Sequence, residues 1–111
     1  MDEERDEIEP FQDEEDEREA AQYAREGVWV REMVETKGWS KVIEPRLMQR
    51  RQSLLNQLLS ADKHEDVIRI QQAVNAIDNL MNFIAACIKL GSVSGERLRA
   101  ARKQGANFQK E

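Results

Sequence analysis

The sequence has few of the residues that build disulfide-linked, metal-binding or β-rich folds. Among 111 residues there are one cysteine, one histidine and two prolines, and only 5% are aromatic. A single cysteine excludes an intramolecular disulfide, and a single histidine excludes the paired-histidine zinc motifs. Because 35% of the residues are charged and few are aromatic, the composition favours one small all-α domain over a β-sandwich.

No pattern for catalysis or cofactor binding is found, so we expect a protein that is not an enzyme. His64, Glu65 and Asp66 are consecutive, so their side chains diverge around a helix start instead of converging on a metal. Cys87 lies on an apolar helix face far from that histidine, which argues against a Cys–His nucleophile. The segment GSVSGE at 91–96 lacks the lysine and the preceding strand of a phosphate loop. We therefore predict no catalytic residue, no cofactor and no metal.

The net charge of −5 hides a strong asymmetry along the chain. Residues 1–35 hold 15 acidic and 4 basic side chains, whereas residues 36–111 hold 7 acidic and 13 basic ones. The first third would repel nucleic acid and anionic membranes, and the remainder could attract them. The N-terminus is acidic and has no basic-then-apolar leader, which indicates synthesis in a reducing, intracellular compartment.

Three regions follow from this pattern. Residues 1–19 carry 12 acids and are expected to form a disordered acidic arm, in which Ile8 and Phe11 are either scattered hydrophobes or the anchors of a docking motif for a basic-rimmed groove. Residues 20–91 are predicted to form an antiparallel helical hairpin or small three-helix bundle with coiled-coil-like packing. Residues 92–111 are predicted to form a short basic helix and tail.

Residue types that start and stop helices divide the central region into helices at 18–37, 39–61 and 63–90. Gly38 and Gly91 are read as helix stops. Ser40 is a candidate N-cap, and Pro45 requires the second helix to start near residue 44 or to kink there. Gly27 weakens the first helix and marks a possible close approach of another helix. The third helix is expected to begin with a capping box formed by Asp62 and Glu65.

The third helix carries two apolar seams at alternating steps of three and four residues. The first contains Val67, Ile70, Val74, Ile77, Met81, Ile84 and Ile88, and the second contains Ala73, Ala76, Leu80, Phe83, Cys87 and Leu90. Successive positions on an α-helix are rotated by about 100°, so the seams lie side by side. Each seam packs against one partner helix, and the hairpin provides a partner for the first. The second must meet the first helix, the C-terminal segment or another chain. Because the other helices are short and charge-rich, we expect at least part of it to bind another chain, with Ala76, Leu80, Phe83, Cys87 and Leu90 as the contact residues.

The polar residues of this helix bear on its other possible contacts. Gln72, Asn75, Asn79 and Asn82 form a polar face, read as solvated, with an amide ladder for a partner backbone as the alternative. Arg69, Asp78 and the amides interrupt the apolar run, so we expect no 18-residue apolar window and no membrane span.

Basic side chains form a second candidate site, for nucleic acid. They fall in two groups, Arg46, Arg50 and Arg51, then Arg97, Arg99, Arg102 and Lys103. No aromatic residues alternate with them, which excludes a stacking platform for single strands, and no helix-turn-helix spacing is present. Contact with a duplex backbone stays open, as does the alternative that these bases neutralise the protein's own acidic arm or that of a neighbouring copy.

The central region also resembles a known class of proteins. Trp39 precedes a helix bearing Pro45 and Leu47, and a helix of the form I-Q-x-A-V-x-A-I-x-x-L follows from Ile70 to Leu80. Over residues 39–90 this resembles small helical structural and morphogenesis proteins of tailed bacteriophages. The resemblance implies a non-enzymatic structural or assembly protein of the virion or host cytoplasm, a homo-oligomer or virion component. The alternative is a small DNA-binding or packaging-associated protein.

Overall fold

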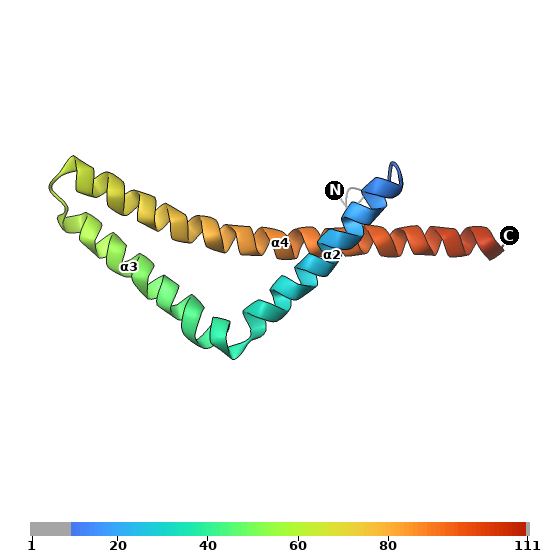
Figure 1. Cartoon of the computed structure of the whole chain (residues 1–111), viewed down its shortest axis with the longest axis horizontal. Coiled ribbons are helices and arrows are strands. Elements are labelled where there is room, and N and C mark those ends of the chain that lie inside the picture. The colour runs from blue at the N-terminus through green and yellow to red at the C-terminus, as the bar shows by residue number, and fades with distance from the viewer. Residues whose placement is uncertain (1–9, 111) are drawn as a thin grey trace, which may run out of the picture. The chain divides into compact units, whose positions relative to one another are not determined.

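A computed structural model describes residues 10–110, with the side chains of residues 10–104. The described chain is all-α and contains no strand, in agreement with the predicted fold class. Its elements are α2 (Glu14–Glu35), the π-helix η1 (Gly38–Ile43), α3 (Glu44–Ser60) and α4 (His64–Lys110) (Figure 1). The chain divides into two compact units, one formed by residues 1–30 with 86–111 and the other by residues 31–85. We describe each unit by itself.

The unit of residues 31–85 is organised around contacts between α3 and the first half of α4. α3 runs into the connection at residues 61–63 and α4 runs out of it, so the two helices have opposite chain directions and diverge away from this connection (Figure 1). Leu54, Ile70, Val74 and Ile77 form its buried apolar cluster. The three α4 members belong to the first seam, whose other four members, Val67, Met81, Ile84 and Ile88, are half-buried. The seam therefore marks the side of α4 that the chain itself covers.

Thr36 links α2 to the π-helix η1, and Pro45 lies where α3 starts. The Thr36 hydroxyl donates a hydrogen bond to the Met33 carbonyl at 2.7 Å, and its oxygen accepts one from the Trp39 backbone N–H at 3.2 Å. These two bonds tie the last turn of α2 to the start of the π-helix η1, whose own N-cap residue, Lys37, makes no side-chain cap bond. Pro45 lies in the first turn of α3, where its missing N–H leaves no bond unmade, so the predicted start near residue 44 is confirmed.

Two predictions for the segment between α2 and α3 are wrong. Gly38 was expected to stop the first helix, but α2 already ends at Glu35 and Gly38 begins the π-helix. Ser40 was expected to be an N-cap, but it lies inside the π-helix and its hydroxyl donates to the Thr36 carbonyl at 2.8 Å. Trp39 is 8% exposed here, and its Nε1 atom has no hydrogen-bond partner among the described residues.

In the other unit, α2 crosses α4 at two glycines. A Cβ added at Gly27 would lie 2.7 Å from the Gly91 Cα, and one added at Gly91 would lie 2.6 Å from the Gly27 Cα. Real Cβ atoms essentially never approach so closely, so both positions require glycine. Gly27 thus marks the close helix approach that its position suggested. Ala20 and Ser94 are buried in the same unit.

Gly91 does not stop a helix, because α4 continues through it to Lys110. The predicted helix at 63–90 and the predicted short basic helix are one element, and the boundary proposed at residue 92 does not separate them. A glycine in a helix interior costs about 1 kcal/mol relative to alanine. Here the absence of a side chain permits the contact with Gly27, which accounts for glycine without a helix end.

The expectation of a disordered arm over residues 1–19 is wrong for its last six residues, since α2 begins at Glu14. The Asp13 carboxylate accepts a hydrogen bond from the Asp16 N–H at 2.8 Å, and the Asp16 carboxylate accepts one from the Gln12 N–H at 3.1 Å. Such reciprocal bonds cap a helix start, and acidic residues in the first turn complement its dipole. The part of the expectation that concerns residues 1–9 lies outside the described residues.

We predict that Gly27→Ala or Gly91→Ala will destabilise the fold. Each new methyl group would clash with backbone atoms of the other helix, which cannot move aside as a side chain could. The expected loss is about 1–3 kcal/mol of unfolding free energy, measured by urea denaturation followed by circular dichroism.

Gly38→Ala is the matched control, because a Cβ at this position has nothing within 4 Å. Alanine at this helical position should be neutral or stabilise by up to about 1 kcal/mol. Equal stability changes at Gly27 and Gly38 would contradict the role assigned to the crossing.

Candidate protein-interaction surface

The second seam of α4 is largely uncovered within the unit of residues 31–85. Leu80 and Phe83 are 43% and 67% exposed, and Ala76 is also exposed. Only Ala73, at the start of this seam, packs against the buried cluster. The cause is rotational, since α3 contacts the first seam and the second is turned about 100° away. We call Ala76, Leu80 and Phe83 the open seam.

The remaining predicted seam residues lie in the other unit. Leu90 is 45% exposed, and Cys87 is a half-buried free thiol whose carbonyl lies at the glycine crossing. Cys87 therefore contributes to packing inside the chain, as a small apolar residue commonly does, whereas Leu90 faces outward.

Arg51 and Asp78 fix how α3 lies against α4. The guanidinium donates two hydrogen bonds to the carboxylate, Nε to Oδ1 at 2.7 Å and Nη2 to Oδ2 at 3.2 Å. Such a two-bond pair fixes the relative orientation of the two side chains and is stronger than a single hydrogen bond. Sequence reasoning missed it, because Arg51 and Asp78 were treated only as members of a basic run and an interrupted apolar run. Their hydrogen bond lowers the pKa of the Asp78 carboxyl.

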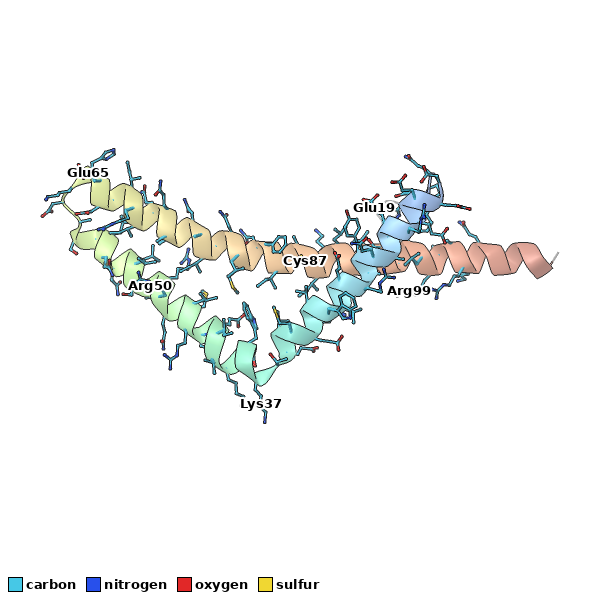
Figure 2. The ribbon with its side chains drawn as sticks, viewed as in Figure 1. Glu19, Lys37, Arg50, Glu65, Cys87 and Arg99 are labelled. Atoms are coloured by element: carbon cyan, nitrogen blue, oxygen red, sulfur yellow. The ribbon has the colours of Figure 1, made fainter. Side chains whose placement is uncertain are left out.

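Arg46 and Arg50 have a different position on α3. Together with Ser53 and Gln57 they follow steps of four, three and four residues, and all four are exposed. They therefore form one solvent-facing stripe of α3. Figure 2 labels Arg50 on this helix.

Arg97, a predicted nucleic-acid contact, has partners within the chain. It donates a hydrogen bond to the Asp16 carboxylate at 3.0 Å, and its guanidinium carbon lies 4.5 Å from the centroid of the Phe11 ring. The Gln12 N–H, aided by Arg97, lowers the pKa of Asp16. These contacts show one base neutralising the acidic segment, as the alternative interpretation held, and they give Phe11 a partner in its own chain.

The other predicted bases are exposed to solvent. Besides Arg46 and Arg50 these are Arg99, Arg102 and Lys103. Arg102 borders an open groove of about 570 Å³ that Glu14, Glu17 and Arg18 of α2 also line. Acidic and basic side chains therefore meet along this stretch of α2 and α4, so Arg102 does not belong to a surface of one sign.

No cluster of three or more histidine, cysteine, aspartate or glutamate residues that could hold a metal ion is found in the described part of the chain. His64 is exposed at the start of α4. The described surface carries exposed apolar and charged helix faces.

By length and composition α4 could cross a membrane. One stretch within His64–Gln104 meets the apolar requirement, and only 11% of that window is buried. This corrects the expectation that no such window exists. The core helix of a soluble protein passes the same test, so this finding does not establish a membrane location. It does show that most of this apolar stretch is uncovered.

Comparison with known proteins gives no relatives: no family model, curated protein or solved structure matches this chain. The functional argument therefore depends on the helix surfaces described above.

Removing the Asp78 charge should have a pH-dependent effect. The pKa of Asp78 is lowered by folding, so its ion pair stabilises the fold above the ordinary carboxylate pKa and is lost as pH falls through the folded value. We expect Asp78→Asn to lower the melting temperature at neutral pH, with the difference from wild type vanishing on acidification. Thermal unfolding across that range measures it.

Asp66→Asn is the control for this experiment. It removes a more exposed pair, with Arg69 three residues away on the same helix, which should contribute little. Equal effects of the two substitutions would show that Asp78 has no special structural role.

Proposed function

We propose that this chain is a non-enzymatic structural or assembly protein of a tailed bacteriophage that acts through helix–helix contacts with a protein partner or with itself. The partner-binding residues are those of the open seam, with Leu90 as a further contact. In this proposal α3 and α4 act as a helical hairpin with coiled-coil-like packing, and a helix of another chain covers the open seam. The protein then works in the virion or the host cytoplasm and requires neither cofactor nor membrane.

The exposure of the open seam carries this proposal. Four side chains form the buried cluster of the unit of residues 31–85, yet Phe83 and Leu80 on the same helix stay open to solvent. Apolar side chains repeated at three- and four-residue steps are the pattern that packs against another helix. Small chains bury a limited share of their surface, so association with a partner supplies stabilisation that the chain lacks alone.

The resemblance of residues 39–90 to phage structural and morphogenesis proteins supports the biological setting. It concerns Trp39, Pro45 and the repeat from Ile70 to Leu80. The open seam overlaps that repeat and extends it to Phe83, so the part of the chain with the resemblance also carries the exposed apolar surface.

We predict that Phe83→Asp will abolish self-association or partner binding, because it places a carboxylate at the most exposed large side chain of the open seam. Loss of a central aromatic contact costs about 2–4 kcal/mol, or roughly 30- to 1,000-fold in affinity. Light scattering coupled to size-exclusion chromatography measures the change, and circular dichroism checks that the helices persist.

Leu59→Asp is the matched control. Leu59 is 88% exposed on α3 and is not part of the open seam, so its replacement should leave association unchanged. A Phe83→Asp protein that associates like wild type would overturn the assignment of the open seam.

The exposed bases favour a second candidate, a DNA-binding or packaging-associated protein. Arg99, Arg102 and Lys103 lie within about one turn of α4 and all are exposed, as phosphate contacts require.

If they bind a duplex, Arg99→Ala with Arg102→Ala should weaken binding. It should also reduce the slope of log affinity against log salt concentration by about 0.9 per lost phosphate contact. Gel shifts of the full-length protein at several salt concentrations test this, and the absence of salt-sensitive binding removes the candidate.

A further inference from the structure

We propose that the partner of the open seam is a second copy of this chain, which docks through an acidic face of its α2. This inference rests on the proposed function and deepens it by naming the partner. It arises from two exposed faces, one in each unit. One face is acidic and the other basic, and each also exposes large apolar side chains. Each face is defined below from its own unit.

The acidic face belongs to α2. Glu15, Glu19, Gln22, Glu26 and Trp29 follow steps of four, three, four and three residues, so they form one stripe of that helix. Glu15 and Glu19 are exposed, and Trp29 is 62% exposed. The stripe therefore presents three carboxylates and ends in an indole that the chain leaves uncovered.

Hydrogen bonds along α2 hold parts of this face in place. The Tyr23 hydroxyl donates to the Glu19 carboxylate at 3.0 Å, and the Gln22 side-chain amide donates to Glu26 at 3.0 Å. The bond to Glu19 raises the pKa of Tyr23. Because two carboxylates are oriented before binding, less side-chain entropy is lost when a partner docks.

The complementary face lies in the unit of residues 31–85 and combines Arg46 and Arg50 of α3 with Leu80 and Phe83 of α4. The Arg51–Asp78 pair sets the register between these helices. Since the helices run in opposite directions, counting outward from this pair brings Arg50 to about the level of Leu80; Arg46 and Phe83 follow further along the two helices, which diverge there (Figure 1). We call these four residues the basic face.

Rotation around each helix places these four residues on one side. Arg51 and Asp78 pair on one side of the buried line formed by Leu54 and Ile77. Arg50 and Leu80 lie beyond that line in the other direction, because each residue advances the helix by about 100°. An apolar stripe with basic side chains along one edge is therefore open to solvent.

The two faces complement each other in both charge and apolar character. An acidic helix ending in a tryptophan supplies carboxylates for Arg46 and Arg50 and an aromatic side chain for Leu80 and Phe83. Tryptophan and arginine are the residues that most often dominate binding energy at interfaces, and opposite charges set orientation and speed the encounter. Figure 2 labels one charge from each face, Glu19 on α2 and Arg50 on α3. Every copy of the chain carries both faces, so a second copy meets the requirement without another protein.

Charge reversal tests the pairing directly. One variant carries Arg46→Glu and Arg50→Glu, and a second carries Glu19→Lys and Glu26→Lys. Each alone brings like charges together and should associate about tenfold or more weakly than wild type. In an equimolar mixture every contact can again join opposite charges, so association should return to within about threefold of wild type. Analytical ultracentrifugation of the full-length proteins measures both results.

Lys63→Glu combined with Glu96→Lys is the matched control, since both residues are exposed and belong to neither face. This variant should associate like wild type.

The inference is overturned if the separate variants associate normally, if mixing does not restore association, or if the wild-type chain stays monomeric. A failure of charge reversal together with a loss of association in Phe83→Asp would reject the acidic face and retain the proposed function. A failure of both would reject both.

Discussion

Helix α4 carries apolar side chains over more of its circumference than α3 covers, and this mismatch leaves one apolar stripe of the unit of residues 31–85 in solvent. Ile70, Val74 and Ile77 are buried with Leu54, while Leu80 and Phe83 on the adjacent stripe face solvent. A helix seam of this kind gains its stabilisation only when a second helix removes it from water. The uncovered stripe is therefore the observation on which the proposed association rests.

Some of the basic side chains of this chain form ion pairs with its own acidic side chains. Arg97 joins Asp16 and Phe11, and Arg51 joins Asp78, so two of the predicted nucleic-acid contacts serve packing within a unit. Both ion pairs are partly open to solvent, where such pairs orient side chains more than they stabilise the fold. The bases without such a role are on surfaces, which leaves Arg46 and Arg50 available to select a partner by charge.

The periodic parts of the fold were predictable from sequence, and the parts set by single contacts were not. Steps of three and four residues identified the buried line of α4 and the uncovered one beside it, because the helix period alone determines which residues share a face. The proline rule located the start of α3. Gly91 was misread because a glycine suits both a helix end and a backbone contact, and only the position of Gly27 decides between them.

The start of α2 is a second case in which single contacts overrule a sequence pattern. Composition assigned residues 14–19 to a disordered arm, since repulsion among carboxylates opposes order. The same stretch contains Asp13 and Asp16 at the spacing of a reciprocal cap, and an acidic first turn favours a helix through its dipole. Local capping and the contact with Arg97 outweigh the repulsion at this point. A run of one charge is thus compatible with a helix where a cap begins it and a base from a distant helix meets it, and in this chain that helix also carries the acidic stripe ending at Trp29.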